Sequence, residues 1–408
     1  MKTSNAGRAK VALGYLLVLS ALLVLPTAAG AQSAVGSTLQ LDDWGKARSS
    51  NIVKFDAPGA TTTVSPGCGI TCGTQALANN AEGEIVGAYT DSNVVSHGFL
   101  RTPEGQIISF DAPMAGSTAN LDQGTFPFAV NNLGMITGAV QDNGNAFHGF
   151  IRFGDGQFEN FDATGAGTGP YQGTIAYSMN LEGVIAGSYF DSSYVEHGFV
   201  RSLFGEFTSF DPDGSIATVV CEETCVNAEG YVVGFFEDSS SVIHGFLRDP
   251  KGNITTIDAP GAGTSAFYGT LVASINNEGT VAGYFVDSNN VAHGFTITRE
   301  GTYAQFDVPG AGTRAFEGTA GFAINSSNVV TGAYWDKNIV MHGFSRTPDN
   351  QYKTFDVSGA GTAANQGTRP STNNWAGAVA GWWVDAQGLN HGFAWLPCSE
   401  LQFPFCQQ

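Results

Sequence analysis

Short runs of hydrophobic residues, separated by Gly, Asn, Asp and Ser, recur along the chain from about residue 52 onward. In one regular stretch, residues 280–286 are apolar on both faces, residues 291–298 form the next run, and a further run ends at Phe306. Turn-forming segments lie between these runs: residues 276–279, 287–290 and 299–301. Apolar spacing typical of an α-helix is absent, so the pattern predicts an all-β chain of short strands joined by tight turns.

The tripeptide His-Gly-Phe gives the period of this pattern, because all seven histidines of the chain lie in it. Their spacings are 51, 49, 47, 49, 49 and 49 residues. An Asp stands six residues before every His, a Gly four residues before every Asp, and a turn residue, Gly in all copies except Asn328, four residues before that Gly. A period near 50 with four strands per unit predicts sheets stacked against their neighbours, as in a β-propeller.

The two ends of the repeat region predict how it closes. The first strand-like segment, "NIVKFDAPGA", has the form of a fourth strand, whereas the last unit ends on a third strand, "HGFAWL". If the N-terminal strand completes the last unit, residues 52–397 form a seven-bladed β-propeller of four-stranded blades with no exposed sheet edge. An open solenoid or a string of separate modules is the alternative, and either would leave the first strand unpaired.

The repeats resemble the extracellular HAF-type repeat family, on the strength of "NNEGTVAGYFVDSNNVAHGF" and "FDVPGAGT" and their sevenfold recurrence over residues 52–397. The resemblance implies a secreted bacterial repeat protein with a propeller fold. Three departures weaken individual units: Val140 where most copies have Tyr or Phe, Asn328 for Gly, and "FDPDGS" in the fourth copy. The paired glycines of kelch repeats are missing.

The remaining segments predict export. Residues 1–31 have a basic start, the apolar run "VALGYLLVLSALLVLP" and a small-residue cleavage site, as a secretory signal peptide does. Residues 32–51 are expected to be an N-terminal extension and residues 398–408 a C-terminal tail. A retained N-terminal anchor is the alternative. The mature chain is expected to lack a membrane span, and to be a monomer in the periplasm or outside the cell.

Charge narrows the choice of partners. The formal net charge is −19, and the signal carries Lys2, Arg8 and Lys10 but no acidic residue, so the mature chain carries −22. Such a field repels nucleic acids and anionic lipid surfaces. No cofactor is expected; Ca²⁺ is a minor hypothesis, because no dense "DxDxDG" loop is present.

The six cysteines form close pairs in the mature chain, which predicts three local disulfides in an oxidising compartment: Cys68 with Cys72, Cys221 with Cys225, and Cys398 with Cys406. A zinc site shared by the first two pairs is the alternative. It requires the two loops to meet, although they lie three units apart in a sevenfold ring.

The repeated Asp and His residues are interpreted as structural staples, in which the carboxylate accepts hydrogen bonds from turn amides and from the imidazole. These residues are Asp91 and His97, Asp142 and His148, Asp191 and His197, Asp238 and His244, Asp287 and His293, Asp336 and His342, and Asp385 and His391. The alternative is a set of general-base dyads or metal ligands. It is disfavoured because catalysis requires one asymmetric site.

Function is expected where the copies differ. The last unit is rich in tryptophan; Trp375, Trp382 and Trp383 are candidates for stacking on sugar rings, although packing between blades is the more common role of such residues. The face with the loops that follow the second and fourth strands, together with the central channel, is the expected ligand site. The favoured hypothesis is a non-catalytic binding scaffold for a polysaccharide or a protein. The alternatives are a polysaccharide lyase or glycoside hydrolase at the channel mouth, and a structural surface protein stabilised by Ca²⁺.

Overall fold

The computed structural model describes residues 51–65, 67–68, 71–221 and 223–396. All of the regular secondary structure in these ranges is β-strand, which confirms the all-β prediction. No helix in the described ranges is long and apolar enough to cross a membrane. The predicted signal peptide, most of the N-terminal extension and the C-terminal tail with Cys398 and Cys406 lie outside the described residues.

The strands pair in chain order as antiparallel groups of one design. From the first to the fourth strand, the groups are β2 (Thr74–Asn79), β3 (Ile85–Thr90), β4 (Ser96–Arg101) and β5 (Ile107–Phe110); β6 (Gly124–Val130), β7 (Ile136–Gln141), β8 (Phe147–Arg152) and β9 (Phe158–Phe161); β10 (Gly173–Met179), β11 (Ile185–Phe190), β12 (Glu196–Arg201) and β13 (Phe207–Phe210); β14 (Ser215–Val220), β15 (Val232–Asp238), β16 (Ile243–Arg248) and β17 (Ile254–Ile257); β18 (Gly269–Ile275), β19 (Val281–Val286), β20 (Ala292–Ile297) and β21 (Tyr303–Phe306); β22 (Gly318–Ile324), β23 (Val330–Trp335), β24 (Met341–Arg346) and β25 (Tyr352–Phe355); β26 (Gly367–Asn373), β27 (Val379–Val384), β28 (Asn390–Leu396) and β1 (Asn51–Phe55).

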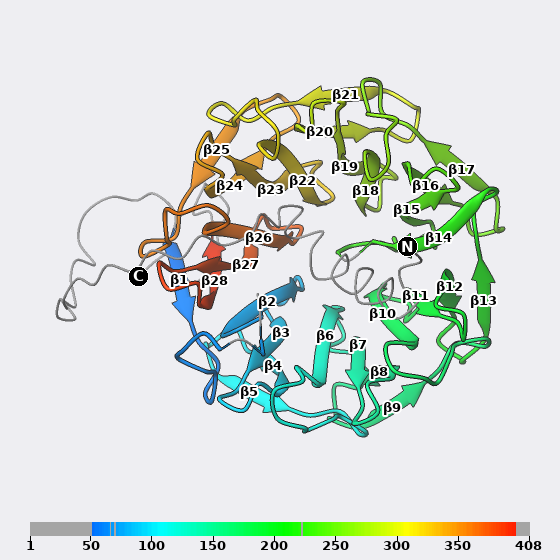
Figure 1. Cartoon of the computed structure of the whole chain (residues 1–408), viewed down its shortest axis with the longest axis vertical. Helices are drawn as coiled ribbons and strands as arrows, with labels where there is room; N and C mark the ends of the chain where they lie inside the picture. Colours follow the sequence, from blue (N-terminus) through cyan, green and yellow to red (C-terminus); the bar gives the residue numbers. More distant parts are fainter. Residues whose placement is uncertain (1–50, 66, 69–70, 222, 397–408) are drawn as a thin grey trace, which may run out of the picture.

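The groups stand side by side around a central axis, as in a β-propeller (Figure 1). The first strand of each group lies nearest the axis and the fourth lies at the outer edge (Figure 1). The first and last described strands lie in one group, because β1 pairs antiparallel with β28 from Asn51 opposite Leu396 to Phe55 opposite Gly392. The sequence predicted this pairing of the first strand with the last, and it satisfies the two edges that an open arrangement would expose.

Short parallel contacts connect neighbouring groups. The residue that opens a first strand bridges to the start of the third strand in the preceding group, as Gly269 does with Ile243 and Gly318 with Ala292. The hydrogen-bonded network divides into sheets of 16 and 12 strands at two junctions. Between β12 and β14 the bridge is missing, whereas between β28 and β2 Gly73 and Asn390 form an isolated parallel bridge outside the strands. The fourth copy has the shorter connection "FDPDGS" between β13 and β14, so it lacks the loop that carries the bridging Gly elsewhere.

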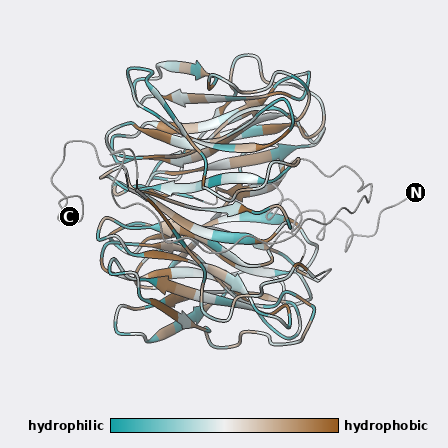
Figure 2. Cartoon of the chain, turned by 90° about the vertical axis from the view of Figure 1, so that its left-hand side faces the viewer, coloured by the Kyte–Doolittle hydropathy of each residue, from teal (hydrophilic) through white to brown (hydrophobic). Residues whose placement is uncertain are grey.

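The Phe of each His-Gly-Phe motif anchors the core, since all seven are fully buried: Phe99, Phe150, Phe199, Phe246, Phe295, Phe344 and Phe393. In six of the seven copies, the Gly before it gives space to an aromatic ring of the fourth strand; a Cβ at Gly294 would lie 2.3 Å from the Phe306 ring. In a side view the hydrophobic residues lie mostly along the strands, and the connections are largely hydrophilic (Figure 2). The motif therefore serves close packing within each group.

One buried Asn per group forms a continuous ring of hydrogen bonds near the axis. The amide Nδ2 of each donates to the backbone carbonyl of the corresponding Asn in the next group, at 2.9 to 3.2 Å, and Asn374 closes the ring by donating to Asn80. Oδ1 of each accepts the backbone N–H four residues later, at 2.9 to 3.1 Å. The members of this asparagine ring are Asn80, Asn131, Asn180, Asn227, Asn276, Asn325 and Asn374.

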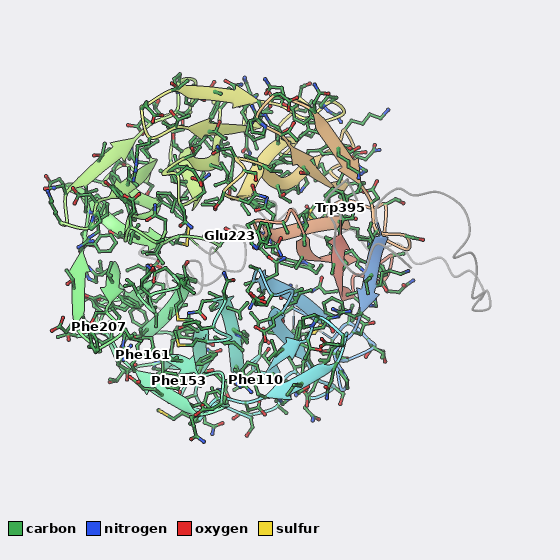
Figure 3. All side chains as sticks on the ribbon, turned by 180° about the vertical axis from the view of Figure 1, so that it is seen from behind. Phe110, Phe153, Phe161, Phe207, Glu223 and Trp395 are labelled. Atoms are coloured by element: carbon green, nitrogen blue, oxygen red, sulfur yellow. A yellow bond between two sulfur atoms is a disulfide. The ribbon has the colours of Figure 1, made fainter. Side chains whose placement is uncertain are left out.

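A second contact between groups joins a third strand to the fourth strand of the preceding group. In five junctions an Arg lies over a Phe ring at 4.6 to 5.2 Å: Arg101 over Phe55, Arg152 over Phe110, Arg201 over Phe161, Arg248 over Phe210, and Arg346 over Phe306. Trp395 stacks on Phe355 at 4.4 Å in a sixth junction. Figure 3 shows Phe110, Phe161 and Phe207 toward the outer edge of the ring.

The asparagine ring gives a direct test of what holds the groups together. In Asn276→Ala, the N–H of Thr280 loses its buried acceptor at 2.9 Å, and the carbonyl of Asn325 loses one of its two donors and keeps the N–H of Asn328. Because buried unsatisfied groups cost about 1–3 kcal/mol each, we expect a loss of roughly 2–4 kcal/mol in the free energy of unfolding, measured by urea denaturation. Gln106→Ala, which removes an exposed carboxamide, is the control and should unfold like the parent; equal midpoints for both variants would contradict the role of the ring.

Candidate functional site

Two features qualify as candidate sites: the repeated His and Asp residues, and a cavity at the centre of the ring. In every group, Nδ1 of the His lies 2.7 to 3.0 Å from the Asp that follows the fourth strand. Nε2 lies farther, 3.4 to 3.9 Å, from the Asp six residues before it. Each imidazole therefore lies between two carboxylates, which come from the turn before the third strand and from the end of the fourth.

The principal partner of each imidazole differs from the one that the sequence predicted. The Asp six residues before the His uses Oδ1 to accept two turn amides, as Asp287 does from Asn289 and Val291 at 2.8 Å. The nearer carboxylates belong to Asp111, Asp162, Asp211, Asp258, Asp307, Asp356 and Asp56. The sequence interpretation gave this second Asp no contact with the imidazole. It missed that the fourth strand pairs directly with the strand that carries the His.

Aromatic rings complete the surroundings of six of the seven imidazoles. A Tyr, Phe or Trp on the second strand stacks on the His ring at 4.3 to 5.1 Å between ring centres. In the second group, Val140 stands opposite His148, so this copy lacks the stack. That explains in structural terms why Tyr or Phe recurs at this position.

The carboxylates shift the titration of these histidines. The hydrogen bond to Asp307 raises the pKa of His293, and the equivalent contacts raise the pKa of His97, His148 and His342. For His391, burial lowers the pKa, but the contacts with Asp56 and Asp385 outweigh it and the pKa is raised. Backbone N–H donors, that of Val242 above all, lower the pKa of Asp238.

This network has a structural role that is repeated in every group. It joins the turn, the third strand and the fourth strand of each group through the same contacts. In the described part of the chain, no three His, Cys, Asp or Glu side chains are grouped so that they could hold a metal ion. Repetition without an asymmetric member gives no copy a distinct acid or base role.

A cavity of about 410 Å³ lies at the centre of the ring, on the side where the first strands end. Residues of the asparagine ring line it, together with the turns that lead into the second strands. The loops after the second and fourth strands lie together on the opposite face, as the hydrogen bond from Phe316 N to Asn290 O shows. This cavity therefore lies at the central channel, which was part of the expected ligand site, but on the face opposite to the loops. The reason is that the alternating strand direction places the turns around the first-strand ends.

The cavity has a constant layer and a variable layer. The asparagine ring is the constant layer. The residue that follows each ring member also lines the cavity but differs from copy to copy: Ala81, Asn132, Leu181, Ala228, Asn277, Ser326 and Trp375. An Asn three residues before each turn Gly, or before Asn328 in the sixth copy, is a signal of this ring that the sequence interpretation missed.

The fourth copy adds a feature of its own. Cys221 and Cys225 form a disulfide directly after β14, with Cα atoms 5.4 Å apart, as predicted. The loop that they close brings Glu223 and Thr224 to the wall of the cavity, and Figure 3 shows Glu223 near the centre of the ring. Among the described residues that line the cavity, Glu223 is the only one with an ionisable side chain.

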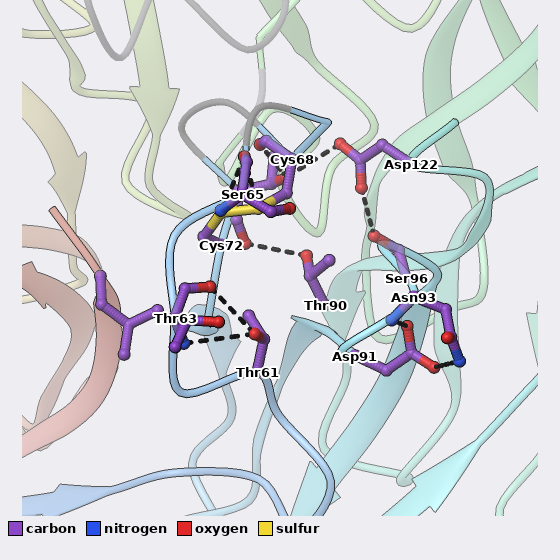
Figure 4. The surroundings of a disulfide bond; sticks show 12 residues. Thr61, Thr63, Ser65, Cys68, Cys72, Thr90, Asp91, Asn93, Ser96 and Asp122 are labelled. Atoms are coloured by element: carbon purple, nitrogen blue, oxygen red, sulfur yellow. Dashed lines mark hydrogen bonds between the residues drawn. A yellow bond between two sulfur atoms is a disulfide. The ribbon is translucent and has the colours of Figure 1, made fainter. Parts of the chain in front are cut away.

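The second observed disulfide, Cys68 with Cys72, lies in the long connection between β1 and β2 (Figure 4). It was also predicted, and with all four thiols oxidised the alternative of a shared zinc site does not hold. Beside it, Asp122 accepts hydrogen bonds from Ser96 Oγ at 2.7 Å and Thr71 Oγ1 at 2.9 Å (Figure 4). Burial raises the pKa of Asp122 to about 6, although the two hydroxyls oppose the shift.

The three candidate tryptophans separate by exposure. Trp375 is 58% exposed and lines the cavity. Trp382 and Trp383 are buried, under Arg369 and against His391 respectively, so the candidate role in ligand stacking is wrong for these two and the more common packing role holds. Their side chains belong to the second strand of the last group, whose faces are both covered by neighbouring groups.

Comparison with known proteins supports the fold. No family model matches the chain, and no curated protein matches it. Solved structures that resemble it include a mutant of puromycin hydrolase complexed with PGG, with a TM-score of 0.50 at 11% identity, covering 82% of this chain and 56% of that one. Another is the BP39L lectin of Burkholderia pseudomallei, with a TM-score of 0.49 at 8% identity, covering 80% and 96%. A third is an Aleuria aurantia lectin mutant in complex with alpha-methyl-L-fucoside, with a TM-score of 0.38 at 12% identity, covering 69% and 93%. Of these three, the first alone has a TM-score that is not below 0.5, and at 11% identity it bears on the fold alone.

The two carboxylates around each imidazole should differ in their effect on its titration. In Asp307→Asn we expect the pKa of His293 to fall toward 6.5, because the hydrogen-bonded carboxylate at 2.9 Å is removed. Asp287→Asn, which removes the carboxylate at 3.9 Å, is the matched control and should lower it less. NMR titration of the imidazole would measure both; a larger effect of Asp287→Asn would overturn the assignment of the principal partner.

The same shift makes stability depend on pH. A His whose pKa is raised by folding contributes stability in full below its unfolded value of 6.5, and the contribution is lost as the pH rises through the folded pKa. The melting temperature should therefore fall as the pH rises above 6.5.

Asp122 makes a separate contribution to the pH dependence of stability, and a single substitution can remove it. Folding raises the pKa of this carboxyl from 3.8 to about 6, so ionising it costs more in the folded protein than in the unfolded chain. The free energy of unfolding therefore falls as the pH rises through that interval. In Asp122→Asn we expect a higher melting temperature at pH 7 and no gain at pH 3.5, measured by scanning calorimetry. Asn also suits the backbone here, because Asp122 has a φ of 52°. A variant that is destabilised equally at both pH values would show that the ionised carboxylate is needed.

Proposed function

We propose that the strand groups are the seven four-stranded blades of a closed propeller, and that the chain is an exported member of the HAF-type repeat family. The pairing of β1 with β28 and the closed asparagine ring support the blade count. Two disulfides among the described residues support an oxidising compartment such as the periplasm or the cell exterior. The segments 1–31, 32–51, 52–397 and 398–408 remain the proposed division of the chain.

The proposed function is non-catalytic binding of a polysaccharide at the mouth of the central cavity. One observation carries it: a variable set of side chains stands on the constant asparagine ring, and it includes an exposed tryptophan. A repeated scaffold acquires a specific site where its copies differ. The variation here is concentrated at one concave place of about 410 Å³, within the size range of ligand sites.

The chemistry of the mouth suits sugar rings. The exposed face of Trp375 offers a flat apolar surface of the kind on which sugar C–H groups pack. Asn132 and Asn277 are exposed at the rim, and Oδ1 of each accepts a backbone N–H of the preceding group. A carboxamide bonded through its oxygen still has two N–H donors for a ligand hydroxyl. Because the mature chain is strongly acidic, we expect a neutral or basic polymer.

The enzymatic alternative is a lyase or glycoside hydrolase at the same place. Glycoside hydrolysis ordinarily requires two carboxyl groups that flank the scissile bond. The described wall of the cavity contributes one carboxyl group, that of Glu223. A single carboxyl group favours binding over hydrolysis. The Ca²⁺-stabilised surface protein is a third candidate; it draws only on the acidic charge and on the turn aspartates, whose Oδ1 atoms already accept backbone amides.

The test is binding of neutral, basic and acidic polysaccharides to the mature protein, by thermal shift and calorimetry. In Trp375→Ala we expect about tenfold weaker binding of the preferred polymer, because its stacking surface is lost. Phe204→Ala removes a 90% exposed aromatic that does not line the cavity and should bind normally.

Two further arms separate the alternatives. Release of reducing or unsaturated ends from the bound polymer, lost in Glu223→Gln, would establish an enzyme in place of a binder. A melting temperature lowered by EDTA and restored by Ca²⁺, without any effect of sugars, would favour the metal-stabilised surface protein.

A further inference from the structure

One junction between groups lacks the contact that the others have. Where β20 meets β17, the Arg of the third strand is replaced by Ile297 and the Phe of the fourth strand by Ile257. Five of the other junctions hold an Arg over a Phe, and the sixth holds stacked Trp and Phe rings. Both partners are thus changed together, and each replacement is smaller than the residue it replaces.

A cavity of about 280 Å³ lies at this junction. Its wall includes Ile257 and Ile297 themselves and side chains from the strands on either side: Leu247, Ile275, Val281 and Tyr231. An apolar cavity of about 150 Å³ in another protein is large enough to stay dry and to bind benzene. The two isoleucines therefore leave a hole of the size of a small ring compound, in the place that the guanidinium and the phenyl ring occupy elsewhere.

Tyr303 is a neighbour of this cavity but no part of its wall. It stands directly across the β20–β21 ladder from Ile297. Its ring stacks on Phe295 at 5.9 Å and does not line the cavity. The described wall is therefore mostly aliphatic, with Tyr231 as its aromatic side chain.

The charges around the cavity favour an uncharged ligand. The one cationic side chain of the described wall, Arg299, forms a salt bridge with Glu229 at 2.5 Å and lies over Tyr231. A carboxylate ligand would have to displace Glu229 and would face the strongly acidic mature chain. A neutral ring would neither have to displace Glu229 nor be repelled by the acidic chain.

We propose that this cavity, which we call the 257/297 cavity, is a binding site for a small uncharged aromatic molecule of the size of phenol. The ring fills the space between the two isoleucines, which a phenyl ring and a guanidinium group fill at other junctions. The site is separate from the polysaccharide site proposed at the ring centre, and neither depends on the other.

The experiment measures phenol binding to the mature chain by saturation-transfer NMR and calorimetry, with an expected Kd on the order of 1 mM for so small a ligand. In Ile257→Phe/Ile297→Arg, which restores the pair found at other junctions, we expect at least tenfold weaker binding with the fold retained. Phe204→Ala, which removes an exposed aromatic elsewhere, should bind as the parent does. Tyr303→Phe, which changes a neighbour that does not line the cavity, is a second control and should also bind phenol as the parent does.

The converse variant tests the same inference by gain of function. Phe210→Ile/Arg248→Ile removes the pair at the preceding junction and should create a second site, raising the phenol stoichiometry from one to two. Phenol binding that survives Ile257→Phe/Ile297→Arg unchanged, or no binding to the parent chain at 10 times the expected Kd, would overturn the proposal. If the restored pair prevents folding, Ile297→Phe fills the cavity with a smaller change and should abolish binding equally.

Discussion

The closed ring of seven asparagine amides is the constraint on which the rest of this structure depends. Each amide donates to the backbone of the next group and accepts a backbone N–H of its own turn, so it fixes one turn and positions its neighbour in a single step. Because Asn374 donates to Asn80, no member lies at an end. In a linear array the last amide and the first carbonyl would lack these partners, and buried polar groups without partners are costly.

The residues that recur in all seven groups serve packing, whereas the residues that differ between groups provide the candidate binding surface. The buried Phe, the close-approach Gly and the paired His and Asp recur in every copy. The residues after the ring asparagines differ, and they gather at one cavity because the ring brings all first-strand ends to the axis. The fourth copy goes furthest: it lacks a loop and a parallel bridge, and its disulfide-closed loop brings Glu223 to the cavity wall.

The two cavities have different origins. The central one follows from the ring arrangement itself, since the first strands cannot fill the axis completely. The 257/297 cavity follows from two coordinated side-chain replacements at a single junction, in a scaffold that elsewhere fills the same space with a cation over an aromatic ring. Such contacts between groups need no particular residue as long as the volume is filled. A pair that leaves the volume open is therefore a departure that packing alone does not explain.

The sequence by itself determined the class of this fold, its period and the two observed disulfides. Alternating apolar runs and turn residues act locally, and a pair of cysteines four residues apart can close only one loop. It also predicted that β1 joins the last group, because an unpaired first strand and an incomplete last unit complement each other. What only the tertiary structure decided are the contacts between residues distant in sequence. It assigned His293 to Asp307, buried Trp382 and Trp383, and placed the cavity on the turn face. It also joined seven asparagines, about 49 residues apart, into one ring. A repeat shows which positions are equivalent, but which of them touch depends on how the strands pair and on how the groups are stacked.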